Sequence, residues 1–196
     1  MRRVLLAAAA ALAAAGPVGA VDVGWPAPAL PGMIPQVSLE AFRGRTVVLE
    51  WTNNGCPYVR HMYASGVMQR LQRDAAGQGV VWLTVISSAP GKQGFLDGAG
   101  AAAWKAKSGA ASADVILDPS GEVGRLYDAR TTPDMFVIDR SGPLVYAGAI
   151  DDRPSTEPAD ARAAHNYVGA ALADLKESRP IAPAVTVSYG CSVKYR

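Results

Sequence analysis

The residues in this sequence best suited to covalent chemistry are its two cysteines, Cys56 and Cys191. Cys56 follows a β-branched and aromatic run at 46–51 that is typical of a buried strand, and four turn-forming residues at 52–55. The next residue, Pro57, suits the first position of a helix. A cysteine between a strand and a helix start lies beside unpaired N–H groups and the positive end of the helix dipole, which favour the reactive thiolate. We therefore predict that Cys56 is a nucleophile rather than a small buried hydrophobe.

Cys191 is the only other thiol, and the sequence leaves its role open. No second cysteine follows Cys56 by one helical turn, because that position holds Val59. Cys191 is either an incidental cysteine of the tail or the partner of Cys56, reached by a tail that folds back over the domain. Pro180 and Pro183 break helix and stiffen that tail. A bridge between the two cysteines would favour the folded state by about 5 kcal/mol through chain entropy.

Glu50 is a carboxylic acid inside the apolar run that precedes Cys56. A buried carboxylate is costly unless it stays protonated or finds hydrogen-bond partners. Strand alternation puts Val48 and Glu50 on one face and Leu49 and Trp51 on the other, without deciding which face is covered. Glu50 therefore either points to solvent or is an acid of raised pKa that relays protons to and from the thiols.

The whole chain alternates extended and helical patterns. Strands are expected at 46–51, 80–86, 115–117, 135–138 and 144–147. Helices are expected at 38–42, 57–76, 99–108, 122–127 and 159–176. Gly66 is a weak point of the second helix, and 87–98 is a loop that could border the active site. Strands alternating with helices, followed by a hairpin and a last helix, predict an α/β sandwich around a mixed sheet.

Several of these motifs together resemble the thioredoxin superfamily, and especially its redoxin branch, which includes peroxiredoxin-like exported bacterial proteins. The strand, turn, Cys-Pro-x-x and helix around Cys56 resemble that family's active site, and Glu50 matches its buried acid. Thr132-Pro133-Asp134 resembles the cis-proline loop, and GCSVKY at 190–195 resembles a C-terminal family motif. The resemblance covers about residues 25–196. It implies a thioredoxin-like three-layer sandwich with a mixed central β-sheet flanked by helices.

The resemblance also implies where a substrate would bind. A cis bond at Pro133 would turn the backbone of Thr132 toward Cys56, where it could pair with a substrate peptide as an added strand. We expect Thr132, Pro133 and Pro57 to contact the substrate, and Cys56, Cys191 and Glu50 to carry the chemistry.

The leading functional hypothesis is an exported thiol–disulfide oxidoreductase with Cys56 as nucleophile and Cys191 as resolving thiol. The alternatives are a divergent thiol peroxidase and a non-catalytic binding or metallochaperone protein of the same fold. Peroxiredoxins carry a proline and a threonine where this chain has Leu49 and Asn53, which weakens the peroxidase alternative. The peroxide-polarising arginine of those enzymes falls near Pro133 by resemblance, with Arg130 and Arg125 as nearby candidates.

The expected partners are protein or small-molecule thiols and disulfides, or peroxide, together with a thiol reductant. We expect no cofactor and no metal, because Cys56, His61 and His165 lack a tight ligand spacing. With Arg2 and Arg3 removed, the 19 basic side chains become 17, equal to the 17 acidic ones, so no nucleic-acid partner is indicated. Asp151 and Asp152 match a motif of the resembled family, but the sequence assigns them no chemistry.

The first twenty residues are typical of an export signal. Arg2-Arg3 precedes an apolar run at 4–15 that is too short to span a bilayer, and small residues follow it. The alternative is an alanine-rich helix or an uncleaved anchor. We expect a cleaved signal peptide at 1–20, a redoxin domain at 21–178, and a tail at 179–196. The mature protein would be periplasmic or secreted, without a membrane span.

Cleavage of that signal makes a direct prediction. N-terminal sequencing of the protein purified from its host should begin close to Val21. A soluble cytoplasmic product that still begins at Met1 would contradict both the export hypothesis and the expectation of a stable disulfide.

Overall fold

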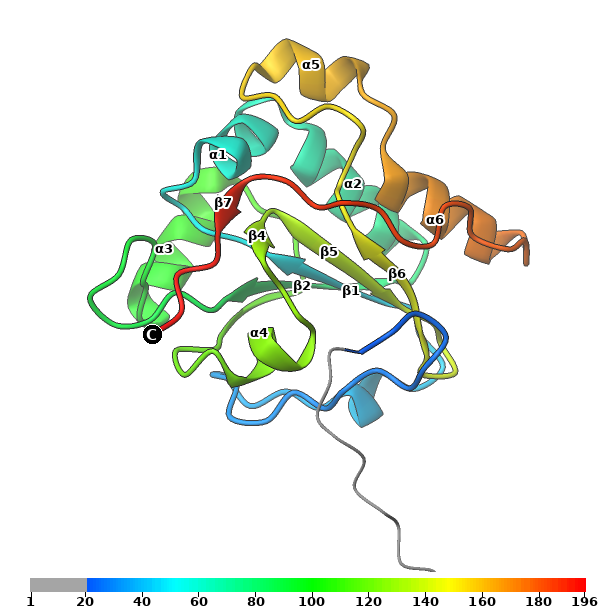
Figure 1. The fold of residues 1–196 in the computed structure, drawn as a ribbon, viewed down its shortest axis with the longest axis horizontal. Coiled ribbons are helices and arrows are strands. Elements are labelled where there is room, and N and C mark those ends of the chain that lie inside the picture. Colours follow the sequence, from blue (N-terminus) through cyan, green and yellow to red (C-terminus); the bar gives the residue numbers. More distant parts are fainter. Residues whose placement is uncertain (1–20) are drawn as a thin grey trace, which may run out of the picture.

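The centre of the protein is a five-stranded mixed sheet with the strand order β3-β2-β1-β5-β6 (Figure 1). The computed structural model describes residues 21–196, so the signal peptide expected at 1–20 lies outside the described residues. The strands of this sheet are β1 (Val47–Trp51), β2 (Val81–Ile86), β3 (Asp114–Leu117), β5 (Asp134–Ile138) and β6 (Leu144–Gly148). The parallel pairs are β1 with β2 and β2 with β3, whereas β5 pairs antiparallel with both β1 and β6.

Helices and loops cover both faces of this sheet, which gives three layers (Figure 1). One face packs against α1 (Pro57–Ala64), α2 (Val67–Gly77), α5 (Pro158–Ala163) and α6 (Tyr167–Lys176). The opposite face packs against α4 (Glu122–Leu126), the 3-10 helix η1 (Leu39–Phe42) and the N-terminal lead-in. α3 (Gly98–Ser108) lies along the β3 edge. The predicted three-layer α/β sandwich around a mixed sheet is confirmed. No helix within residues 21–196 is long and apolar enough to cross a membrane.

β1 is the central strand, and all five of its residues are buried. Val48 belongs to the core beneath α1 and α2, whereas Leu49 and Trp51 belong to the core on the other face, as strand alternation requires. The Trp51 ring contacts Phe136 edge-on, with ring centroids 5.1 Å apart. This packing from both sides fixes the end of β1, and with it the turn that leads to Cys56.

Two of the expected helices are each divided in the structure. The helix expected at 57–76 is wrong, because Gly66 adopts a left-handed conformation (φ 75°) and separates α1 from α2. The helix expected at 159–176 is also wrong. Ala164 is extended, and the Asn166 side chain then caps α6 by accepting a hydrogen bond from the Gly169 N–H at 2.7 Å.

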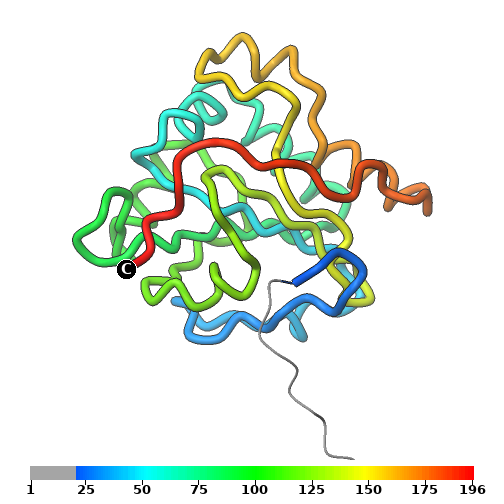
Figure 2. Tube along the Cα trace, viewed as in Figure 1, coloured from blue at the N-terminus to red at the C-terminus, as the bar shows by residue number. Residues whose placement is uncertain are grey.

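The tail after α6 runs back across the molecule instead of projecting from it (Figure 2). It first follows β6, where the Thr186 N–H donates to the Ala147 carbonyl at 3.1 Å. It then forms the two-residue strand β7 (Cys191–Ser192), which pairs antiparallel with β4 (Thr131–Thr132). Near its end, the Lys194 carbonyl accepts a hydrogen bond from the Ala89 N–H at 2.9 Å, so the tail reaches the loop after β2.

The break between α1 and α2 predicts opposite effects for two glycine substitutions. Gly66→Ala should lower the free energy of unfolding by about 1–2 kcal/mol, because an alanine is strained in the left-handed conformation. Gly77→Ala should raise it by about 0.4–1 kcal/mol, because Gly77 is helical and no atom lies within 4 Å of the added Cβ. Urea unfolding of both variants measures this. Equal effects of the two substitutions would contradict the assigned break.

Candidate functional site

Cys56 occupies the position immediately before α1, as the N-cap residue with an extended backbone (φ −77°, ψ 124°). The predicted helix start at Pro57 is confirmed. The Cys56 N–H donates to the Asn53 carbonyl at 3.0 Å, and this turn holds the residue between β1 and α1. The Cys56 side chain is fully buried, with 0% of its surface exposed. Anything that reacts with it must therefore displace the residues that cover it.

The residue that covers Cys56 is Cys191. Their Sγ atoms are 2.7 Å apart, although the residues lie 135 positions apart in the sequence. Both thiols are free in the structure. The pairing of β7 with β4 sets Cys191 opposite Thr132, whose carbonyl oxygen is 3.1 Å from the Cys56 Sγ. The Thr132–Pro133 peptide bond is cis. The tail thus lies along the edge of β4, where the sequence analysis expected a substrate peptide to pair with Thr132.

Gly190 makes this close approach of the tail possible. Its backbone is in a region that favours glycine (φ 126°), and an added Cβ would lie 2.1 Å from the Thr132 carbonyl oxygen. That oxygen is backbone and cannot move aside without breaking the β4–β7 pairing. A glycine immediately before Cys191 is therefore a steric requirement of the contact between the two thiols.

The environments of the two thiols push their pKa values in opposite directions. Burial opposes ionisation of Cys56, but hydrogen bonds with Cys191, Thr132 and the Val59 backbone hold the pKa of Cys56 below its ordinary value. Burial, the hydrogen bond to Cys56 and the charge of Cys56 together raise the pKa of Cys191 to about 11. Cys56 is therefore the more readily ionised thiol of the pair, and Cys191 the less readily ionised one.

Glu50 is fully buried on the side of β1 that packs against α1 and α2. Its carboxylate accepts hydrogen bonds from four side chains: Tyr63 Oη at 2.8 Å, Gln72 Nε2 at 2.9 Å, Trp82 Nε1 at 2.8 Å and Thr84 Oγ1 at 3.3 Å. Burial raises the pKa of Glu50 to about 7, although these hydrogen bonds lower it in part. Glu50 is thus poised to gain or lose a proton near neutral pH. Among the described residues it has no hydrogen bond to either thiol.

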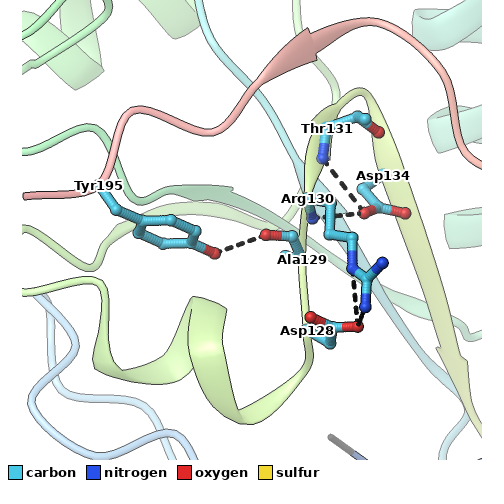
Figure 3. Close-up of polar contacts among 6 residues, drawn as sticks. All are labelled: Asp128, Ala129, Arg130, Thr131, Asp134 and Tyr195. Atoms are coloured by element: carbon cyan, nitrogen blue, oxygen red, sulfur yellow. Dashed lines mark hydrogen bonds and ion pairs between the residues drawn. The ribbon is translucent and has the colours of Figure 1, made fainter.

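Asp134 is a buried acid of this site that the sequence analysis placed in the Pro133 loop without assigning it a role (Figure 3). Its Oδ2 accepts hydrogen bonds from the backbone N–H groups of Arg130 at 3.0 Å and Thr131 at 3.5 Å. Burial raises the pKa of Asp134 to about 7, against the effect of those hydrogen bonds. The carboxyl group therefore shapes the loop that carries β4. The sequence feature that could have indicated a buried role for Asp134 is its position directly after Pro133, at the start of an apolar strand.

The other candidates from the sequence lie apart from the thiols or are engaged elsewhere. Arg130 pairs with Asp128 at 2.5 Å (Figure 3), and the Arg125 guanidinium lies 4.6 Å from the centre of the Tyr195 ring. His61 is a buried residue of α1. Within residues 21–196, no group of three or more His, Cys, Asp or Glu side chains is arranged to hold a metal ion.

One protein family matches most of the chain. The redoxin family model matches residues 23–164, which include Cys56, Glu50 and the Pro133 loop. The chain belongs to the redoxin family. A comparison with curated protein sequences returns no match.

Solved structures agree with the fold of this redoxin. An uncharacterized conserved protein from Geobacillus kaustophilus is 27% identical, with a TM-score of 0.74, over 89% of this chain and 93% of that one. A protein from Chlorobium tepidum assigned as the thiol:disulfide interchange protein DsbE is 25% identical, with a TM-score of 0.55, over 81% and 98%. The thioredoxin domain of a thiol-disulfide oxidoreductase from Bacteroides vulgatus is 19% identical, with a TM-score of 0.51, over 65% and 89%. The predicted thioredoxin-like fold is confirmed.

The raised pKa of Glu50 predicts how stability depends on pH. Between the ordinary value of 4.5 and the folded value of about 7, the folded redoxin keeps a proton that the unfolded chain has released. The folded state therefore loses stability as pH rises through this window, by about 3 kcal/mol in total. Glu50→Gln removes this contribution, so the variant should lose less stability than the wild type across the same range.

Urea unfolding of both proteins from about pH 4 to about pH 8 measures the difference. Asp134 also has a raised pKa of about 7 and therefore contributes to the pH dependence of the wild-type free energy of unfolding. The contribution of Glu50 is the difference between the wild-type and Glu50→Gln curves. Parallel curves would contradict the assignment of a proton to Glu50.

Proposed function

We propose that this redoxin is an exported thiol–disulfide oxidoreductase in which Cys56 is the nucleophile and Cys191 the resolving thiol. The observation that carries the proposal is the 2.7 Å separation of the two Sγ atoms, combined with opposite shifts of their pKa values. A thiol of lowered pKa forms the thiolate, which is the attacking form, more readily than an ordinary thiol. A protonated second thiol in contact with it is suited to the later, resolving step.

The reaction has two exchange steps. The Cys56 thiolate attacks one sulfur of a substrate disulfide, breaks the S–S bond and releases the other sulfur as a thiolate. Cys191 then loses its proton and attacks the Cys56 sulfur of the mixed disulfide, which releases the second substrate thiolate and leaves a Cys56–Cys191 disulfide. Two electrons pass from the cysteine pair to the substrate. A thiol reductant returns the pair to the reduced state.

The substrate would bind at the edge of β4 that the tail occupies. Cys56 is buried beneath Cys191, so the tail must move before a substrate sulfur can reach it. A displaced tail would free the backbone of Thr132 for pairing with an extended peptide, bordered by Pro133 and the exposed Pro57. The tail would then act as an intramolecular occupant of the substrate site as well as the carrier of the resolving thiol.

Glu50 would serve the thiols as a proton donor and acceptor. A folded pKa of about 7 suits a group that exchanges protons near neutral pH. Tyr63 links it to α1, the helix that begins beside Cys56, through the 2.8 Å hydrogen bond to the Glu50 carboxylate. Because no hydrogen bond joins Glu50 to a thiol, the transfer would require a mobile water molecule or movement of the tail.

The structural relatives support disulfide exchange as the activity. The Chlorobium tepidum protein carries the name of a thiol:disulfide interchange protein and aligns over 81% of this chain. Export would bring the redoxin into an oxidising compartment where its substrates and its own disulfide can persist.

The proposal predicts different fates for the two cysteine variants. With oxidised glutathione as substrate, Cys191→Ser should accumulate mixed disulfides on Cys56, because no second thiol can release them. In a single turnover of the reduced protein without added thiol, release of the second glutathione should slow by about 100-fold, since the effective concentration of the resolving thiol is lost. Cys56→Ser should trap no mixed disulfide. Mass spectrometry of acid-quenched samples and a coupled turnover assay measure both effects.

Controls separate the competing functions. The assay is run with a chelator, since turnover in its presence excludes a purely metal-carrying role. It is repeated with hydrogen peroxide as oxidant, since sulfenic acid formed at Cys56 in Cys191→Ser would indicate a thiol peroxidase instead. Equal turnover by the wild type and Cys191→Ser would refute the resolving role of Cys191.

A further inference from the structure

Asp151 is a buried acid that the proposed chemistry does not use. It follows β6, and only 2% of its surface is exposed. A backbone bridge to Asn166 fixes it to the scaffold, in front of α6. Its Oδ1 accepts a hydrogen bond from the Tyr189 hydroxyl at 2.5 Å and another from the Arg153 N–H at 2.9 Å. The first of these bonds attaches the tail to the sheet.

Tyr189 stands two residues before Cys191 and faces the segment that carries Cys56. Its ring contacts the ring of Tyr58, with centroids 5.8 Å apart and planes at 64°. Tyr58 lies in the first turn of α1, two residues after Cys56. One tyrosine of the tail therefore contacts both the fixed carboxylate and the helix of the nucleophile.

The histidine of α1, His61, lies close enough to Asp151 to interact electrostatically with this carboxylate. The Nδ1 atom of His61 is 2.6 Å from the Tyr58 carbonyl oxygen, which can only accept, so Nδ1 carries the proton. The His61 Nε2 and the Asp151 Oδ2 are both buried and have no hydrogen-bond partner among the described residues. Burial raises the pKa of Asp151, whereas the Tyr189 hydroxyl, the Arg153 N–H and His61 lower it. Burial is the largest of these effects, so the pKa of Asp151 stays above its ordinary value, and Oδ1 is the acceptor of the Tyr189 hydroxyl.

We propose that Asp151 is a positioning residue that, through the Tyr189 hydroxyl, sets how strongly Cys191 is held at Cys56. The inference rests on the proposed resolving role of Cys191. Only Gly190 separates Tyr189 from Cys191, so a fixed tyrosine leaves little freedom to the thiol. Beyond Cys191 the tail has other attachments, from the Val193 N–H to the Arg130 carbonyl at 2.9 Å and from the Tyr195 hydroxyl to the Ala129 carbonyl at 2.7 Å. Loss of the Asp151 bond should therefore loosen the tail on one side of Cys191 without detaching it.

The equilibrium of the cysteine pair with glutathione measures this holding directly. One oxidised glutathione takes two electrons and two protons from the thiols of Cys56 and Cys191, which gives one intramolecular disulfide and two reduced glutathiones. The equilibrium constant of this exchange equals an effective concentration of Cys191 at Cys56. A role that stabilises the oxidised and reduced proteins equally does not change it.

The test compares Asp151→Asn and Tyr189→Phe with the wild type and with Asp152→Asn, a matched change at the exposed neighbouring acid. Asp151→Asn and Tyr189→Phe should each lower the constant by about tenfold or more, because an amide oxygen is a weaker acceptor than a carboxylate and phenylalanine has no hydroxyl to donate. Asp152→Asn should leave it unchanged. If Asp151→Asn does not fold, Tyr189→Phe decides alone, since it removes one hydroxyl and keeps the ring contact with Tyr58.

Two outcomes would overturn the inference, and they can be told apart. Wild-type constants in both Asp151→Asn and Tyr189→Phe would refute the positioning role while leaving the resolving role of Cys191 intact. A wild-type protein that forms no Cys56–Cys191 disulfide at any glutathione ratio would refute the proposed function itself.

Discussion

The short pairing between β4 and β7 is the interaction on which the rest of the site depends. It joins Thr132 to Cys191 and brings two thiols together that lie 135 positions apart in the chain. Two residue pairs contribute little stability by themselves, so the attachments on either side of Cys191 must hold the tail. On the N-terminal side of Cys191, the Thr186 N–H donates a hydrogen bond to the Ala147 carbonyl. On the C-terminal side, the Tyr195 hydroxyl donates one to the Ala129 carbonyl. Gly190 permits the close approach to the Thr132 carbonyl that a side chain would block.

Burial of charge shapes the chemistry available at this pairing. Desolvation alone would raise the pKa of a buried thiol, and Cys56 escapes this only because hydrogen-bond donors surround its sulfur. Glu50 has four donors around its carboxylate and still has a pKa raised to about 7, because it is fully buried. The redoxin therefore combines a thiol of lowered pKa at the start of α1 with a carboxyl group in β1 that titrates near neutrality. That arrangement suits a reaction in which thiolates form and protons must be moved.

Elements that depend on neighbouring residues could be predicted from the sequence, whereas features that depend on contacts between distant residues could not. The strand before Cys56 and the helix start at Pro57 follow from residue types within a few positions, so both were predictable. Gly66 was recognised as a weak point of the helix, but the helix was still expected to continue because the apolar spacing extends across this left-handed residue. Strand alternation could not decide whether Glu50 is buried, since this depends on α2 covering that face. The tail pairing leaves almost no pattern in the sequence, because β7 is two residues long.

The central claim is that Cys56 and Cys191 form a redox pair within one molecule. Mass spectrometry of the native protein, with free thiols trapped at the moment of lysis and the protein then digested without reduction, tests it most directly. The account predicts one pair of peptides, containing Cys56 and Cys191, that is linked in the oxidised protein and separates on reduction. Two singly alkylated cysteines after exposure to an oxidant, or links only between different molecules, would contradict it.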